Sequence, residues 1–214
     1  MLIALLALLA AYLIGAIPFG YLVVKLTTGT DVRSSGSGNI GATNVWRSTG
    51  RAAGIVTLLL DIAKGAFAVW LAGKLTAGNI NWMSAAALAV MAGHAFPVFL
   101  KFQGGKAVAS FVGAYLVLAP IPLLAVLIVF IGVVAATRHV SLGSVLAAGT
   151  FPLAVWIFMQ PPLSLVAASI ISGAFIIYRH RANLARIRAG TEHVFSLGHR
   201  PHSSPAPGWR TRRS

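Results

Sequence analysis

The chain has 214 residues, of which 57% are apolar and 9% are charged, and seventeen Lys and Arg residues stand against three Asp and Glu residues. This composition excludes an ordinary water-soluble domain and indicates an integral membrane protein. The absence of cysteine excludes disulfides, thiolate metal sites and a cysteine acyl-enzyme. Because the apolar residues form membrane-length runs, the net charge of +14 indicates anionic partners and membrane orientation rather than nucleic acid.

Apolar runs predict the membrane-spanning helices. They fall at residues 2–24, 53–73, 82–100, 107–136, 142–159 and 163–178. A helix needs about 20 residues to cross the bilayer, so the fourth run is too long for one span. Pro120 and Pro122 interrupt it, which predicts a short, proline-broken pair of helices. The chain is therefore predicted to be all-α with seven transmembrane helices.

The first run also resembles a signal peptide in its position, but it is too long and carries no basic residue before Lys25. We therefore expect it to be retained as the first span. The positions of the basic residues then decide between six and seven spans. Seven spans put residues 31–51, 101–106, Arg138 and the C-terminal arginines on one face, whereas six would divide them between both faces.

The positive-inside rule therefore places the N-terminus outside and the C-terminus in the cytoplasm. We expect a single membrane domain over residues 1–196. Residues 197–214, rich in Ser, Pro, Arg and His, are expected to form a disordered basic cytoplasmic tail near anionic lipid.

The first polar segment, residues 31–51, contains Gly36, Gly38 and Gly41 in GxGxxG spacing. A dinucleotide site would need a preceding β-strand, and here a membrane helix precedes the glycines. What remains is an anion site built from backbone N–H groups, to which Arg47 adds a guanidinium that can hold phosphate through two hydrogen bonds. Short polar side chains add further donors: Ser37, Asn39 and Thr43. The alternative is a flexible cytoplasmic loop.

The second polar segment, residues 101–110, has the sequence KFQGGKAVAS, in which Gly104, Gly105 and Lys106 precede a predicted helix. This layout suits phosphate binding. It is not a P-loop, because Ala107 stands where a Ser or Thr would bind Mg²⁺. The alternative is a charged loop that only follows the positive-inside rule.

The third polar segment, residues 178–194, places His180, Asn183 and Arg186 at helical spacing after the last span. A basic helix of this kind can lie along the membrane surface. The alternative is a basic anchor beside the membrane. Asn183 and Glu192 argue against that alternative, since neither side chain favours membrane adhesion.

Asp61 and Lys64 lie three residues apart within the second span, on one face of the predicted helix. We expect them to form an ion pair that fixes helix packing. We likewise expect His94 to be packed and hydrogen-bonded.

Missing motifs restrict the chemistry. No His is followed by four residues and an Asp, no GxSxG sequence occurs, and no pair of acidic residues is placed for acid and base catalysis. An enzyme of this sequence would therefore need a substrate that arrives activated. The protein would supply position and positive charge, and we expect neither a metal nor a cofactor.

Together the three polar segments resemble one family, the bacterial acyl-phosphate:glycerol-3-phosphate acyltransferases of the PlsY type. The resemblance lies in DVRSSGSGNIGATNVWRSTG, GHAFPVFLKFQGGKAVAS and RHRANLARIRAGTE, with DIAKG in the second span, and it covers nearly the whole chain. The chain departs from the family at Ala107, where glycine is usual, and at Ser110, where threonine is usual. Ala107 bears on the local backbone geometry.

The resemblance implies a seven-span protein of the bacterial inner membrane with its active site at the cytoplasmic face. It implies transfer of a fatty acyl group from a long-chain acyl phosphate to the sn-1 hydroxyl of glycerol 3-phosphate. The products would be lysophosphatidic acid and inorganic phosphate, in an early step of phospholipid synthesis. Besides membrane lipid, the enzyme that makes acyl phosphate is a candidate partner.

Matching positions give the expected roles. Three residues would bind glycerol 3-phosphate: Ser37, Arg47 and Lys106. Four would hold acyl phosphate, Thr43, Gly104, Gly105 and Asn183, with Ser144 of the SLGS turn as a further candidate. Backbone groups of Gly36 and Gly38 would help to bind substrate. Asn39 and His180 would orient polar groups, and Glu192 would support the fold by pairing with an arginine.

The general base stays open between His180 and a substrate phosphate. A transporter for an organic phosphate is the main rival function, favoured only by the broken pair around Pro120. A noncatalytic membrane anchor is a third hypothesis, and it leaves the three polar segments unexplained.

Overall fold

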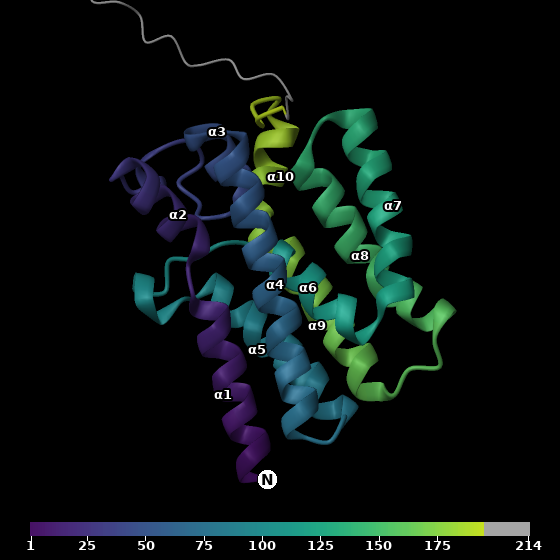
Figure 1. The fold of residues 1–214 in the computed structure, drawn as a ribbon. Helices are drawn as coiled ribbons and strands as arrows, with labels where there is room; N and C mark the ends of the chain where they lie inside the picture. The colour runs from purple at the N-terminus through teal and green to yellow at the C-terminus, as the bar shows by residue number, and fades with distance from the viewer. Residues whose placement is uncertain (195–214) are drawn as a thin grey trace, which may run out of the picture.

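The computed structural model describes residues 1–194, and every regular element within that range is helical (Figure 1). The α-helices are α1 (Leu2–Ala16), α2 (Phe19–Thr28), α3 (Ala42–Thr49), α4 (Arg51–Leu75), α5 (Ile80–Ala95), α6 (Val108–Leu118), α7 (Pro120–Thr137), α8 (Val140–Phe158), α9 (Leu163–Arg179) and α10 (Arg181–Arg188). Two 3₁₀ turns, η1 (Val32–Ser34) and η2 (Val98–Leu100), lie in connections. The predicted tail, residues 197–214, lies outside the described residues.

Within residues 1–194, five helical segments are long and apolar enough to cross a membrane. They are Leu2–Thr28, Arg51–Leu75, Ile80–Leu100, Pro120–Thr137 and Val140–Phe158. A sixth is reached if α9 and α10, which are bent by 52° relative to each other, are taken together. The all-helical, multi-span prediction is therefore confirmed, while the count of seven and the orientation of the termini stay predictions.

The predicted proline break lies between α6 and α7. The chain turns at Ala119, and Pro120 and Pro122 fall in the first turn of α7, where a missing N–H group costs no helical hydrogen bond. Only α6, with 11 residues, is short, whereas α7 has 18 residues and is long enough to span. The expectation of a short pair is thus right for one helix of the two.

Small residues bring α4 and α6 close together. A Cβ atom at Gly65 would collide with the backbone of Ser110, and one at Gly113 would collide with the backbone of Ile62. Because the lipid offers no hydrophobic drive for helices to associate, such backbone contact contributes much of the packing attraction. This contact fixes α6, and with it the second polar segment that leads into α6, against α4.

An aromatic cluster joins α6 to α8 and α9. The rings of Phe111, Tyr115 and Phe151 have centroid separations of 4.6 to 4.9 Å. The buried Tyr115 hydroxyl also lies 3.0 Å from Ser172 Oγ on α9, so its polar end has a partner. The helices that support the site therefore share one core.

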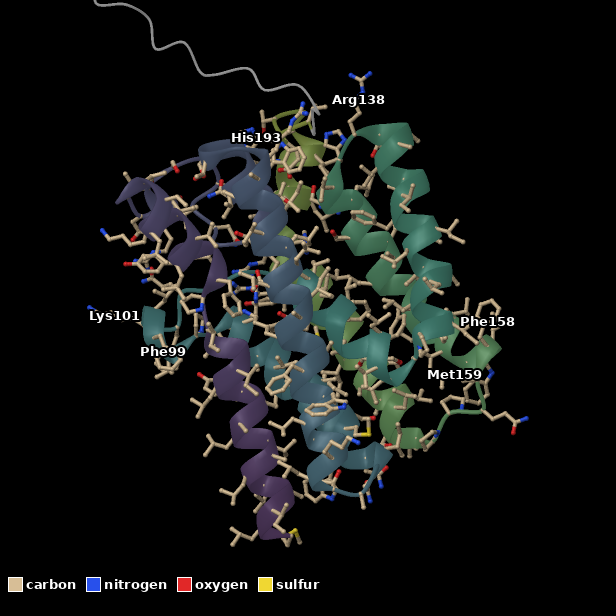
Figure 2. All side chains as sticks on the ribbon, in the orientation of Figure 1. Phe99, Lys101, Arg138, Phe158, Met159 and His193 are labelled. Carbon is tan, nitrogen blue, oxygen red and sulfur yellow. The ribbon has the colours of Figure 1, made fainter. Side chains whose placement is uncertain are left out.

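The first and third polar segments lie at one end of this bundle. Figure 1 shows α3, from the first polar segment, near α10, from the third, at the end opposite the N-terminus. In Figure 2 the labelled side chains of His193 and Arg138 lie at this same end, and Phe158 and Met159 lie toward the other. This arrangement fits the prediction of a shared face for the first and third polar segments and Arg138, whereas Lys101 of the second segment lies at the side of the bundle (Figure 2).

Candidate active site

A cavity of about 520 Å³ lies where the three polar segments meet. Most of the predicted site residues line it: Ser37, Asn39, Thr43, Arg47, Lys106, Ser144, His180, Asn183 and Glu192. They come from five parts of the chain that only the folded bundle brings together. Gly36, Gly38, Gly104 and Gly105, which we expected to contact substrate, are not among the lining residues.

The other side of the cavity is apolar. From α4 it is lined by Ile55, Leu58 and Ile62, from α6 by Val112, and from α7 by Leu127, Phe130 and Val134. The same cavity therefore offers cationic and hydrogen-bonding groups in one part and hydrocarbon in the other. This division suits a ligand with an anionic head and an apolar chain.

Asn44, which sequence reasoning did not select as a site residue, organises the loop of the first polar segment. Its buried side-chain NH₂ group donates to the carbonyl oxygens of Val32, Ser35 and Asn39 at 3.2, 3.1 and 2.8 Å. Its Oδ1 atom accepts a hydrogen bond from the backbone N–H of Ser37 at 2.8 Å. One side chain thus satisfies loop groups that would otherwise lack partners. The sequence signal for this role was an Asn that directly follows a glycine-rich loop.

Gly36 and Gly38 shape this loop rather than line the cavity. Their φ values are +60° and +68°, in the left-handed region that glycine adopts readily. A Cβ atom at Gly36 would also collide with Asn44 Oδ1. These glycines shape the loop from which Ser37 and Asn39 reach the cavity, and their direct contact with substrate stays a prediction.

Gly104 and Gly105 likewise do not line the cavity, and they support the segment that carries Lys106. The N–H of Gly105 donates to the carbonyl of His94 at 3.1 Å, and Arg179 Nη2 donates to the carbonyls of Gly104 and Gly105 at 3.2 and 2.8 Å. A Cβ atom at either glycine would collide with His94. These contacts position Lys106, and direct binding of phosphate by the two glycines stays a prediction. Arg179 was missed, since sequence spacing does not show that it reaches this loop.

Ala107 takes a backbone conformation that explains why related sequences carry glycine there. Its φ is +62° and its ψ is +11°, in the left-handed region. An L-residue with a Cβ pays about 1 kcal/mol for this conformation. Ala107 is fully buried between Lys106 and the start of α6, so its surroundings hold it in place.

A chain of hydrogen bonds connects the second and third polar segments. Lys106 Nζ donates to Asn183 Oδ1 at 2.7 Å, and Asn183 Nδ2 donates to Glu192 Oε1 at 2.6 Å. Glu192 also accepts from Ser141 Oγ at 2.9 Å and from Arg186 Nε at 2.7 Å. The structure thus contains the expected pairing of Glu192 with an arginine, and it adds Ser141, which sequence reasoning missed although it lies three residues before Ser144.

Burial and charge shift the pKa values in this network. Burial, reinforced by Arg186 and Arg47 and opposed by Glu192, lowers the pKa of Lys106 to about 8. Burial raises the pKa of Glu192, but the hydrogen bonds from Asn183, Ser141 and Arg186 outweigh it, so the pKa lies below its usual value. At neutral pH the network therefore holds a charged lysine beside a charged carboxylate.

His180 is neutral at physiological pH. Burial, together with the charge of Lys106, lowers its pKa to about 4. Its Nδ1 atom lies 2.8 Å from the carbonyl oxygen of Ile176, which can only accept, so Nδ1 carries the proton. Nε2 is then left as a bare acceptor in a side chain that lines the cavity. This geometry suits acceptance of a hydrogen bond from a hydroxyl group better than contact with an anion.

Arg47 is the exposed cation of the cavity. Within residues 1–194 its side chain makes no hydrogen bond and no ion pair within 4.0 Å, although Trp46 and Thr43 of the same helix line the cavity with it. The protein atoms that surround it and the nearby Arg186 lower its pKa, but a guanidinium stays charged at any physiological pH. Its five donors are therefore available to an anion.

Ser144 is buried at the cavity wall, and its Oγ donates to the carbonyl of Val140 at 2.9 Å. The hydroxyl proton is thus already in use, so the hydroxyl would have to rotate before it could donate to an anion. The structure therefore gives Ser144 a less direct position than Arg47 or Lys106.

The predicted ion pair of the second span is present, and a third group joins it. Lys64 Nζ lies 2.8 Å from Asp61 Oδ1, and His94 Nδ1 lies 3.5 Å from the same oxygen. All three side chains are buried. Asp61 and His94 also line the cavity, which sequence reasoning did not anticipate.

The apolar helices enclose one cavity, which is cationic in one part and apolar in the other. This is the arrangement expected of a membrane protein whose ligand has an anionic head and an apolar chain. The family model for glycerol-3-phosphate acyltransferases matches residues 5–190, so the chain belongs to this family. The resemblance found in the three polar segments is thereby confirmed.

Related proteins match the sequence of this chain over nearly their full length. The protein named glycerol-3-phosphate acyltransferase from Trichlorobacter lovleyi is 48% identical over 186 residues, which cover 86% of this chain and 94% of the relative. The protein of the same name from Geobacter sulfurreducens is 45% identical over 185 residues, with the same coverage of both chains.

Two solved structures have the same fold. Both are crystal structures of PlsY (YgiH), an integral membrane glycerol 3-phosphate acyltransferase. Its glycerol 3-phosphate form is 38% identical with a TM-score of 0.85 and covers 90% of this chain and 96% of that chain. Its lysophosphatidic acid form is 37% identical with a TM-score of 0.82 and covers 90% and 95%. The prediction of an integral membrane protein is thus confirmed.

Proposed function

We propose that this protein transfers a fatty acyl group from a long-chain acyl phosphate to the sn-1 hydroxyl of glycerol 3-phosphate. The products are lysophosphatidic acid and inorganic phosphate, and the reaction takes place at the cytoplasmic face of the bacterial inner membrane. One observation carries the proposal: a single cavity joins Arg47 and Lys106 to an apolar wall formed by α4, α6 and α7. Membership of the family supports glycerol 3-phosphate as the acceptor.

Each substrate has a part of the cavity that fits its chemistry. Arg47, Lys106 and Ser37 bind the phosphate of glycerol 3-phosphate through charge-assisted hydrogen bonds. Asn183 and Thr43 contact the acyl phosphate, Thr43 from the first turn of α3, where N–H groups favour negative charge. The acyl chain lies along the apolar wall.

The reaction needs no acyl-enzyme. The sn-1 hydroxyl attacks the acyl carbon, the new C–O ester bond forms, and the bond between the acyl carbon and the phosphate oxygen breaks. Phosphate leaves, and Lys106 and Arg47 stabilise the negative charge that it carries away. An acyl phosphate is a mixed anhydride with a good leaving group, so positioning and electrostatics supply the catalysis.

The hydroxyl proton goes to one of two acceptors. His180 has a pKa of about 4, so it is a weak base at neutral pH. A substrate phosphate has a higher proton affinity and lies next to the reacting atoms. We therefore favour a substrate phosphate as the proton acceptor, with His180 Nε2 orienting the reacting hydroxyl.

The test is a reconstituted assay. Purified protein in detergent or lipid is given palmitoyl phosphate and glycerol 3-phosphate, and the release of lysophosphatidic acid and inorganic phosphate is measured. We expect product from acyl phosphate and none from the control donor, palmitoyl-CoA. Uptake of glycerol 3-phosphate into sealed vesicles without acyl transfer would instead identify a transporter.

The lowered pKa of Lys106 predicts a pH dependence. Because only the charged lysine binds phosphate strongly, kcat/KM for glycerol 3-phosphate should fall as the pH rises through about 8 and Lys106 loses its proton. The fall should be about tenfold between pH 8 and pH 9.5. In Lys106→Arg the cation does not titrate in this range, so a profile that still falls would assign the dependence to another group.

A further inference from the structure

The buried carboxylate of Asp61, in the second span, lines the cavity. A role in helix packing alone would not require this position. Asp61 and His94 both line the cavity, and Asp61 is only 2% exposed. Asp61 projects from α4 and His94 from α5. The cavity therefore meets a buried carboxylate.

One oxygen of this carboxylate lacks a hydrogen-bond donor among residues 1–194. Lys64 Nζ lies 2.8 Å from Asp61 Oδ1 and pairs with it, and the same ammonium donates a hydrogen bond to the carbonyl of Ile17, also at 2.8 Å. His94 Nδ1 is 3.5 Å from the same oxygen, too far for a strong hydrogen bond. Oδ1 is fully buried, and among residues 1–194 nothing donates to Oδ2. Oδ2 is thus the oxygen left to accept a donor from the cavity.

Asp61 lines the same cavity as the cations of the proposed phosphate site. The backbone carbonyl of its neighbour His94 accepts a hydrogen bond from the N–H of Gly105 at 3.1 Å. A Cβ atom on Gly105 would collide with the His94 ring. The next residue is Lys106. Lys106 and Asp61 thus line one cavity, so a small ligand held by Lys106 at its phosphate has this carboxylate among the groups that it can contact.

We propose that Asp61 Oδ2 accepts a hydrogen bond from the C2 hydroxyl of glycerol 3-phosphate and so selects a polyol phosphate as acceptor. This inference rests on the acceptor site proposed above. A carboxylate repels phosphate, so a hydroxyl is the group that fits. Asp61 Oδ1 is paired with Lys64 and only Oδ2 is left to accept, which suits recognition of the nonreacting hydroxyl, since His180 Nε2 is the acceptor proposed for the reacting one.

The two glycerol hydroxyls then have separate acceptors, His180 Nε2 for the reacting one and Asp61 for the other. The enzyme would therefore discriminate between glycerol 3-phosphate and acceptors that lack the C2 hydroxyl. Dihydroxyacetone phosphate has a carbonyl oxygen at C2 and brings no hydrogen to the carboxylate. It would leave two acceptors facing each other, and a site built around a hydrogen bond rejects such an analogue strongly.

The first experiment changes the acceptor and leaves the protein intact. Wild-type enzyme is assayed with palmitoyl phosphate and either glycerol 3-phosphate or 3-hydroxypropyl phosphate, which keeps the phosphate and a primary hydroxyl but lacks the C2 hydroxyl. We expect kcat/KM to be roughly tenfold to a hundredfold lower for the analogue, as for loss of a hydrogen bond to a charged group. Equal values for both acceptors would overturn the assignment of Asp61. Failure to acylate either acceptor would instead contradict the proposed function.

The second experiment removes the acceptor group. In the double variant Asp61→Ala/Lys64→Met no unpaired buried charge remains, and we expect kcat/KM to fall for glycerol 3-phosphate but to stay within about twofold for 3-hydroxypropyl phosphate. The preference between the two acceptors should therefore be lost, and Asp61→Asn, which retains an oxygen, should give an intermediate preference. Equal losses with both acceptors would show a structural role and overturn the proposal. If the double variant does not fold, the wild-type comparison decides.

Discussion

Replacing Lys106 with alanine is expected to lower kcat/KM for glycerol 3-phosphate by roughly tenfold to a hundredfold. The variant loses charge-assisted hydrogen bonds worth about 1.5 to 3 kcal/mol, and each 1.4 kcal/mol corresponds to about tenfold in rate. It also leaves the Asn183 side-chain oxygen without its 2.7 Å donor, in a side chain that is buried. The measurement is initial rate against acceptor concentration at pH 7, where Lys106 in the wild type is charged.

Lys101→Ala is the matched control. Lys101 lies in the same polar segment and carries the same charge, but it is exposed and does not line the cavity. Figure 2 shows it on the outside of the molecule near Phe99, far from His193. Both variants remove one positive charge from the chain, so general electrostatics should affect them alike. A loss in Lys101→Ala as large as that in Lys106→Ala would rule out a specific contact between Lys106 and the phosphate.

The helices and the gathering of polar residues were predictable from local sequence patterns. A run of apolar residues specifies a spanning helix because the bilayer leaves few alternatives for the backbone, and Pro120 marks a break because it lacks an N–H group. The lining of the cavity by Arg47, Lys106 and Asn183 was predictable through the family resemblance, since each lies in a long motif. Spacing alone would not have brought residues 77 positions apart into contact, as Lys106 and Asn183 are.

What the sequence did not show are the contacts that act over long separations to hold the site. The hydrogen bonds of Arg179 to the Gly104–Gly105 turn and of Ser141 to Glu192 join residues 74 and 51 positions apart, so they depend on how the helices pack. The roles of the glycines are ambiguous in the sequence for a related reason. A glycine that exposes N–H groups to a ligand and one that makes room for a neighbouring residue have the same sequence signature, and only the structure shows that Asn44 packs beside Gly36 and His94 beside Gly105.

Glu192→Ala is expected to reduce both stability and activity. Glu192 is 9% exposed and accepts hydrogen bonds from Ser141, Asn183 and Arg186. Its removal leaves those donors without a partner at a cost of about 3 kcal/mol, taking about 1 kcal/mol for each bond. Because Asn183 in turn positions Lys106, we expect kcat/KM to fall at least tenfold together with a lower thermal unfolding midpoint in detergent.

The pH dependence of stability follows from the same bonds. The pKa of Glu192 is lowered in the folded protein, so its contribution is present above the usual pKa of a glutamate and is lost as the pH falls through the lowered value. The wild type should therefore lose stability in acid more steeply than Glu192→Ala.

Arg188→Ala is the control for the C-terminal helix, because Arg188 lies on α10 but is exposed and, among residues 1–194, makes no hydrogen bond to Glu192. It should keep near wild-type stability and activity. If Glu192→Ala keeps its unfolding midpoint and loses only activity, Glu192 acts on Lys106 through its charge rather than by holding α10. If it keeps both, the hydrogen-bond chain from Lys106 to Glu192 does not support the site.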